Sequence, residues 1–315
     1  MKNYFIIVIA IIIFGTACQK PLEIDYPEQE PALVVNCLFA PDSLFVARIS
    51  HTAPTDDSTN LSISDANCEI WSEGEKLATL THSENGFYSN PNLMAEVGKA
   101  YTIKVSHPDY PNISATDTVP EQATISEIYT EYFTKYDPLG ETYFNQLYLK
   151  INDNPEKNNF YQIRSKVLTL YIDKEWDGDT TWTIIDTIYQ YQPIYLSNNS
   201  LLIRNEEIDE NKIAFFSDKY FNGRNTLLNF EYSLPFSGSN GGEPYLSEHD
   251  LIITFKTISY QYYNYTKQLE KHVYNQYSDL INGISDPVQM TTNIKNGYGI
   301  FAAYNPQTFI LHHQN

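Results

Sequence analysis

The chain has 315 residues, of which 42% are hydrophobic and 14% aromatic, and this composition excludes a disordered chain. The formal net charge of −19 repels a phosphate backbone, and no cluster of Lys and Arg offsets it, so we exclude nucleic-acid binding. The 26 tyrosines and the many β-branched residues favour pleated, half-buried surfaces, which indicates β-structure.

Residues 1–17 have the features of a lipoprotein signal peptide. Lys2 gives a small positive start, and the apolar run Tyr4–Phe14 is too short to span a bilayer, which takes about 20 residues. Gly15-Thr16-Ala17 then places small residues before Cys18, which resembles the bacterial lipobox. We therefore expect cleavage before Cys18 and a diacylglycerol on its thiol. The alternative is an ordinary cleaved signal with an incidental cysteine.

Residues 18–31 form a polar, proline-rich stretch that we interpret as a lipidated tether. Burial of lipid methylene groups anchors such a protein without a transmembrane helix. Lys20, with Glu23 and Asp25 close behind, partly resembles a surface-export signal of Bacteroidota lipoproteins. We expect a lipid-anchored protein of the outer membrane, on its periplasmic side or on the cell surface.

Cys37 and Cys68 are the two other cysteines. An exported chain meets an oxidising environment, which allows a disulfide between them. The alternative is a pair of buried free thiols, because the sequence does not give the distance between their Cα atoms. There is no C-x-x-C pair, so neither a thiol redox centre nor a zinc site is indicated.

Residues 32–120 are predicted to form an immunoglobulin-like β-sandwich. Short alternating segments follow one another at a spacing of about 8–12 residues, with turn signals between them, which is typical of that fold. Pro120 marks the expected end of this domain. The expected strands are Leu33–Phe39, Leu44–Ser50, Ala66–Trp71, Lys76–Thr81, a piece from Gly86, Lys99–His107 and Ser114–Val119.

Residues 121–315 are predicted to form a larger β domain, an antiparallel sheet or a barrel-like structure with one helix. Trp182–Tyr191 is expected to pair with Val167–Asp173 in a hairpin. Apolar residues recur at a period near 3.6 over about 260–281, after Ser259 as N-cap, and predict the helix. The other expected strands are Thr124–Thr134, Thr142–Ile151, Phe160–Ile172, Tyr195–Ile203, Thr226–Ser233 and Asp250–Thr257.

No motif in the sequence indicates catalysis, a cofactor or a metal site. Asp173–Asp179 imitates the start of a calcium loop, but Ile184 stands where a Glu must close the coordination sphere, so a hairpin tip is the better interpretation. The acidic run Glu206–Glu210 is interpreted as a solvated loop, and the seven histidines show no metal-ligand spacing. A nucleophile elbow, a P-loop and a dinucleotide fingerprint are all missing. We therefore expect a protein that is not an enzyme.

Tyrosines gather at the start of the predicted helix. Tyr262 and Tyr263, with Tyr260 and Tyr265 beside them, offer a stacking platform for a sugar or a peptide. The alternative is core packing, because some side chains of a helix must face the core. We keep Tyr262 and Tyr263 as candidate ligand or partner contacts.

The order of several short segments resembles a known family. They are Pro31–Asn36, Ile63–Ala66, Gly86–Tyr88, Gly98–Thr102, Val105–Tyr110, Phe216–Asp218, Phe221–Gly223, Ile258–Tyr263 and Thr292–Phe301. Together they resemble the Bacteroidota lipoprotein family of domain of unknown function 4249, over nearly the whole mature chain. The resemblance implies an outer-membrane lipoprotein, often encoded beside a TonB-dependent receptor, with no known enzyme activity.

The segment Asn293–Phe301 is the most specific of these pieces. Its Gly297 and Gly299 permit a positive φ or a close backbone approach before the chain re-enters the sheet. We interpret the segment as structural, with a ligand loop as the alternative, and keep both glycines as candidate contacts.

Three functions fit these observations. An accessory lipoprotein that works with a TonB-dependent β-barrel receptor in uptake is favoured, and it predicts an exposed apolar or aromatic patch. A stand-alone glycan- or peptide-binding surface lipoprotein requires a concave pocket with exposed aromatic residues. A hydrolase requires titratable groups that converge in a cleft.

Overall fold

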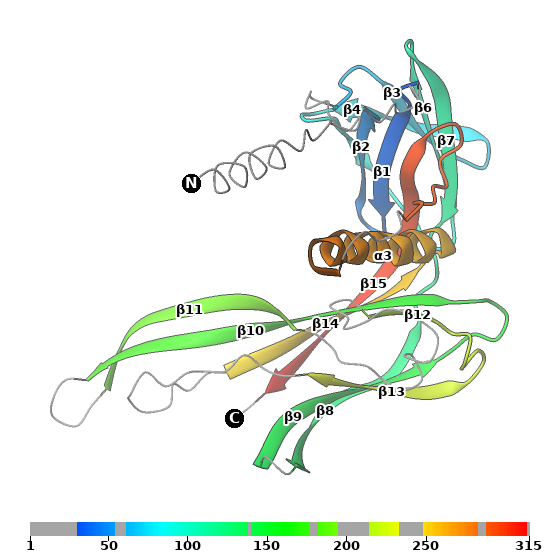
Figure 1. Ribbon diagram of the computed structural model, residues 1–315. Helices are drawn as coiled ribbons and strands as arrows, with labels where there is room; N and C mark the ends of the chain where they lie inside the picture. Colours follow the sequence, from blue (N-terminus) through cyan, green and yellow to red (C-terminus); the bar gives the residue numbers. More distant parts are fainter. Residues whose placement is uncertain are drawn as a thin grey trace, which may run out of the picture. The chain divides into compact units, whose positions relative to one another are not determined.

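The computed structural model describes residues 30–53, 61–137, 140–176, 182–194, 214–232, 248–282 and 288–313 (Figure 1). Ala32–Asn315 forms one compact unit. The described elements are mostly strands with one long helix, which confirms the predicted fold class. In chain order they are β1 (Leu33–Phe39), β2 (Leu44–His51), β3 (Asn67–Ser72), β4 (Glu75–His82), β5 (Phe87–Met94), β6 (Ala100–His107), β7 (Tyr110–Thr118), β8 (Thr124–Asp137), β9 (Gly140–Asn152), β10 (Phe160–Trp176), β11 (Trp182–Ile194), β12 (Ala214–Ser217), β13 (Asn225–Tyr232), β14 (Glu248–Ile258), α3 (Tyr260–Asn282) and β15 (Tyr298–His313).

Twelve strands form one large sheet in the order β11-β10-β14-β15-β1-β2-β5-β4-β3-β6-β7, with β12 beside β10. A smaller sheet has the order β13-β9-β8. Among the described strands, β1 and β15 pair in parallel, from Val34 opposite Tyr298 to Phe39 opposite Ala303. The large sheet is therefore mixed rather than purely antiparallel. It is also not a closed barrel, because its strand order ends at β11 and β7.

The first seven strands enclose one hydrophobic core. Alternate residues of β1 and β2 point inward, and Val35 and Ile49 are fully buried. The ring of Phe39 on β1 contacts that of Tyr101 on β6 at 5.8 Å and that of Phe301 on β15 at 4.6 Å. Because β1 and β6 are not neighbours in the sheet, these contacts join two layers, which agrees with the predicted sandwich. Burial of each such aromatic side chain stabilises the fold by about 1.5–3 kcal/mol.

A second core lies between the large and the small sheet. It includes Leu149 on β9, Phe230 on β13 and Phe255 on β14, all nearly inaccessible to solvent. A third cluster lies under α3, which crosses β15 (Figure 1). β15 contributes side chains to all three clusters. This strand therefore links the two regions that the sequence predicted as separate domains, and the division at Pro120 stays a prediction.

Most of the expected strands are present with similar bounds. The predicted hairpin of β10 and β11 is confirmed, with Leu168 opposite Tyr191 and Trp176 opposite Trp182. The strand expected at Tyr195–Ile203 lies outside the described residues. β12 was not predicted, because its four residues are too few to show alternation.

The helix α3 begins where the sequence predicted it. The backbone N–H of Tyr262 donates a hydrogen bond to Ser259 Oγ at 3.2 Å, which confirms Ser259 as N-cap. Among the residues that the structure describes, no helix is sufficiently long and apolar for a membrane span.

Cys37 and Cys68 are free thiols in the structure, and the disulfide that the sequence allowed is not formed. Both side chains lie in the first core, at 1% and 0% exposure. Burial raises the pKa of the Cys68 thiol to about 12 and raises the pKa of the Cys37 thiol as well. Thiols that stay protonated at neutral pH lack the thiolate that disulfide exchange needs.

Candidate functional site

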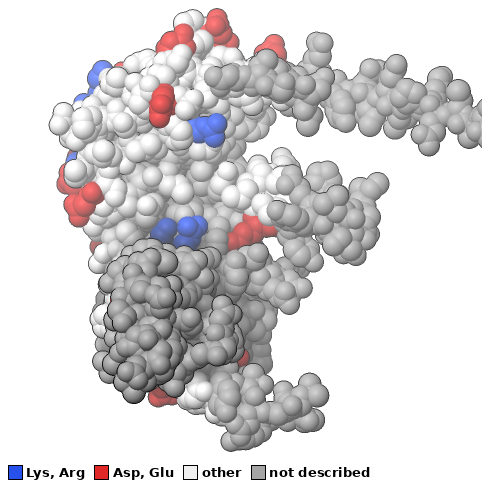
Figure 2. Space-filling view, turned by 90° about the vertical axis from the view of Figure 1, so that its left-hand side faces the viewer, with Lys and Arg blue, Asp and Glu red and all other residues white. Residues whose placement is uncertain are grey.

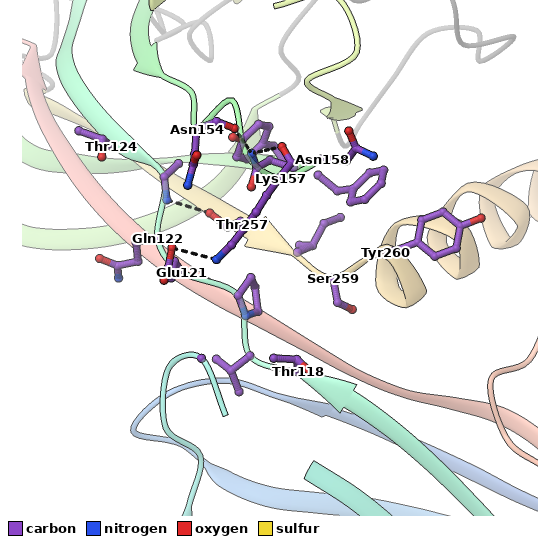
Figure 3. Close-up of a pocket in the computed structure, with 18 of the residues that line it drawn as sticks. Thr118, Glu121, Gln122, Thr124, Asn154, Lys157, Asn158, Thr257, Ser259 and Tyr260 are labelled. Carbon is purple, nitrogen blue, oxygen red and sulfur yellow. Dashed lines mark hydrogen bonds and ion pairs between the residues drawn. The ribbon is translucent and has the colours of Figure 1, made fainter. Parts of the chain in front are cut away.

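A polar groove of about 550 Å³ lies where β7, the linker after it, the β9–β10 loop and the start of α3 meet (Figure 3). The side chains labelled in Figure 3 extend from Thr124 at one end to Tyr260 at the other. This volume falls in the range of small-molecule sites, about 300–1,000 Å³. The groove is lined by residues 98, 117–124, 152, 154, 157–161 and 257–260.

The linker between β7 and β8 forms one wall, and hydrogen bonds fix it to β14 and β15. The side-chain amides of Asn305 and Gln307 donate to the carbonyl oxygens of Pro120 and Ala123, at 2.8 and 2.7 Å. The backbone N–H of Ala123 donates to Thr257 Oγ1 at 2.9 Å. The wall is therefore preformed rather than a loose linker.

The loop between β9 and β10 forms the opposite wall, and two buried carboxylates hold it. Asp153 accepts hydrogen bonds from the Tyr161 hydroxyl at 2.6 Å and from the Gly223 backbone N–H at 2.8 Å. Asp218 accepts one from the Asn159 backbone N–H at 2.6 Å. Burial raises the pKa of Asp218 and that of Tyr161, and the Asp153 charge adds to both effects. This network gives the segments Phe216–Asp218 and Phe221–Gly223 a structural role.

The end of β7 and the start of α3 meet at Asp117. Its carboxylate accepts hydrogen bonds from the backbone N–H groups of Thr118 and Ala303, at 2.9 and 2.8 Å. The Ser259 hydroxyl also hydrogen-bonds to it. Burial raises the pKa of Asp117, while these donors lower it. The carboxylate is thus used to fix three elements rather than to face the groove as a free charge.

Charged groups are scattered over the described part of the face seen in Figure 2. Small groups of basic and acidic residues stand there between wide uncharged areas. Within the described residues, no group of three or more His, Cys, Asp or Glu side chains is arranged to hold a metal ion. The groove is therefore the candidate site that the described residues offer for a ligand other than a metal ion.

A family model described as Domain of unknown function (DUF4249) matches residues 19–310. The chain belongs to this family. No curated protein matches the chain. The DUF4249 description names no activity.

The specific DUF4249 segment near the C-terminus is a backbone junction. Gly299 has a φ of +97°, and a Cβ there would collide with the backbone of Val35 on β1. A Cβ on Gly297 would lie 2.7 Å from the carbonyl oxygen of Leu33. Asn293 clamps the following strand, because its side chain hydrogen-bonds both the N–H and the C=O of Phe301. The structure thus favours the structural interpretation of both glycines over a ligand loop.

Tyr262 and Tyr263 are buried, at 6% and 8% exposure, so the predicted stacking platform is not available at these residues. Their rings pack against Tyr304 at 5.9 Å and Phe160 at 4.8 Å, on the side of α3 that covers the sheet. Tyr260, at 56% exposure, lines the groove.

Other predicted features lie wholly or partly outside the described residues. These include Cys18, Glu206–Glu210 and the tip of the hairpin that imitates a calcium loop. The strands on either side of that tip pair up to Trp176 and Trp182, which agrees with a hairpin. The groove itself was missed in the sequence. The dense asparagines of residues 152–159 were the signal that could have shown one of its walls.

Exposed apolar side chains gather on the outside of β1, β2 and β5. Leu38, Leu44, Val46 and Met94 are 41%, 37%, 45% and 51% exposed. Leu44 lies directly opposite Met94, and Val46 shares the face of Leu44 because it is two residues further on. Buried residues of β1 and β2 face the first core, so these four side chains point away from it. We call this surface the outer apolar face.

Proposed function

We propose that this DUF4249 protein is a lipid-anchored outer-membrane lipoprotein that works with a TonB-dependent receptor in uptake. The short apolar run that ends at Cys18 supports the lipid anchor. The family resemblance supports the receptor as partner. The outer apolar face carries the proposal, because exposed apolar side chains that gather on one face mark an interaction site.

The outer apolar face suits docking by side chains rather than by strand addition. β1 is paired on both sides, with β15 and β2, and β2 is paired with β1 and β5. Many backbone groups of these strands are therefore already paired, over Val34–Phe39 with β15 and at Leu44 and Val46–Arg48 with β5. A partner would gain affinity by covering Leu38, Leu44, Val46 and Met94 with its own apolar groups.

The lipid anchor is tested on the mature protein from bacterial membranes. We expect mass spectrometry to find a diacylglyceryl group on Cys18 as the first residue, and we expect Cys18→Ala to release the protein into the soluble fraction. An unmodified mature N-terminus would reject the anchor.

Docking is tested by pull-down from solubilised outer membranes. We expect the wild-type chain to recover a β-barrel receptor, and the double variant Val46→Lys with Met94→Lys to lose it, because two charges would have to be buried in the interface. The matched control, Leu227→Lys with Ile310→Lys, adds the same charge at residues 45% and 54% exposed on β13 and β15. Equal recovery by both double variants would contradict the proposal.

The groove favours a second candidate function, a stand-alone binding protein for a polar ligand. It has the concavity and the exposed aromatic residue that such a function requires. Its walls are fixed by hydrogen bonds, so less conformational entropy is lost when a ligand binds.

A further inference from the structure

We infer that the groove between the β7–β8 linker, the β9–β10 loop and α3 binds an uncharged, polyhydroxylated ligand, a short neutral oligosaccharide. This inference deepens the second candidate function, ligand binding at the groove, and does not depend on receptor docking. Four features of the groove carry it: the balance of its charges, its open carboxamides, its aromatic end and the pairing of its strands.

Lys157, Glu121 and Asp117, which line the groove, already form ion pairs or hydrogen bonds with other groups of the protein. Lys157 is the single Lys or Arg among the lining residues, and its Nζ lies 3.3 Å from Glu121 Oε2. This ion pair joins the two walls (Figure 3). Asp117 is held by the donors described above. An anionic ligand would therefore find no free cation in the lining, and a cationic one would have to displace existing bonds.

Carboxamides supply the hydrogen-bonding groups that remain. Within the described part of the chain, the side chains of Asn152 and Asn158 have no hydrogen-bond partner, and both line the groove. Gln122 donates through Nε2 to Pro306 O, which leaves its side-chain oxygen open. Each carboxamide offers a donor and an acceptor in one plane. That pairing matches a hydroxyl group, which also donates and accepts.

An aromatic surface closes one end of the groove. Tyr260 is 56% exposed on the first turn of α3, and its ring lies 5.4 Å from that of Phe160. An exposed ring with an apolar body and a polar tip can cover the C–H face of a sugar while its hydroxyl stays in water. A sugar ring is apolar on its face and polar at its edge. The groove matches both properties, because its walls carry polar groups and its end carries an aromatic residue.

An extended peptide fits the groove less well. β10 and β14, which lead into the groove at Phe160 and Thr257, have neighbours on both sides. Just before β8, the N–H and the C=O of Ala123 already bond to the side chains of Thr257 and Gln307. A peptide would find few backbone partners for strand addition, which is the main source of affinity in that mode.

The test is an array of neutral glycans, including α- and β-linked glucans, mannan, xylan and galactan, probed with the purified full-length mature chain. Polygalacturonate, heparin and a peptide library are the charged and peptidic comparisons. Titration calorimetry then measures affinity for the best neutral oligosaccharide. We expect Tyr260→Ala and Asn158→Ala each to weaken it about tenfold, which corresponds to about 1.4 kcal/mol. The control Tyr298→Ala removes a tyrosine of similar exposure, 49%, outside the groove and should bind as wild type.

Neutral-glycan binding that depends on Tyr260 and Asn158 supports the inference. No neutral glycan bound, binding of anionic polysaccharides or peptides alone, or glycan binding unchanged by both groove variants would each overturn it. Since these assays contain no receptor, the pull-down with the Val46 and Met94 variants can fail or succeed independently.

Discussion

At the scale of single residues, Gly299 is the described glycine at which an added Cβ would approach the surrounding atoms most closely. It combines a φ of +97° with a Cβ position that would lie 2.8 Å from the carbonyl carbon of Val35. We expect Gly299→Ala to lower the free energy of unfolding by about 3–5 kcal/mol, because left-handed strain adds to separation of β1 from β15. Urea unfolding measures this loss.

Gly74 provides the matched control for Gly299. It has a φ of +85°, but a Cβ there would meet nothing within 4 Å. Gly74→Ala should therefore lose only about 1–2 kcal/mol, the cost of left-handed strain alone. Similar losses in the two variants would show that the contact with β1 is not what requires Gly299.

At this scale, the role of a residue could be predicted from the sequence when that role depends only on residues nearby in the chain. Ser259 was predicted as an N-cap because capping involves only the next turn of the chain. The burial of Tyr262 and Tyr263 was left open, since the face of α3 that meets the sheet is set by strands distant in sequence. Asp153 and Asp218 meet across 65 residues, and no local pattern could have paired them.

At the scale of elements, α3 carries an acid on its partly buried side. Burial raises the pKa of Glu270 to about 7, and the charge of Arg164 on β10 opposes this only in part. A raised pKa means that the folded protein holds the proton more tightly than the unfolded chain. The penalty is therefore absent below about pH 4.5, grows between pH 4.5 and 7, and is complete above pH 7.

We expect Glu270→Gln to raise the free energy of unfolding at pH 8 and to leave it unchanged at pH 4. A fully sealed group would give about 3 kcal/mol, and solvent screening at this partly exposed side chain reduces the gain to about 1–2 kcal/mol. Chemical unfolding at both pH values measures the difference. Glu84→Gln, at an exposed turn, makes the same charge change and should have little effect at either pH. A gain that is equal at pH 4 and pH 8 would contradict the assigned cause.

Strands were predictable where one face is buried. β1, β2 and β6 alternate between buried and exposed residues, and their bounds match the sequence closely. β15 was foreseen only as a re-entry near Ile300, because Asn305, Pro306 and Gln307 interrupt its apolar pattern. Two of these polar residues, Asn305 and Gln307, hold the groove wall. The polar residues that obscured the strand pattern in the sequence are therefore part of the candidate site.

At the scale of the whole molecule, β15 connects the two regions that the sequence predicted as separate domains, residues 32–120 and 121–315. Its pairing with β1 connects residues at opposite ends of the chain, and strand order at that distance cannot be read from periodicity. The groove is a consequence of the same connection, since its linker wall is bonded to β15. The groove could not be predicted from the sequence, because β15, the strand that holds its linker wall, was itself predicted only in part.

This role of β15 predicts one cooperative thermal transition for Ala32–Asn315, the described compact unit. Phe301 is fully buried in the first core, whereas Phe309 and Leu311 pack against the second. Because one strand belongs to both cores, a substitution that destabilises the first core should destabilise the second as well. We expect Phe301→Ala to cost about 3–5 kcal/mol and to lower the whole transition by roughly 6–15 °C in differential scanning calorimetry. Ile310→Ala, at a residue 54% exposed on the same strand, should change it little. If Phe301→Ala instead split the trace and left a second transition at the wild-type temperature, the two regions would unfold independently and β15 would not couple them.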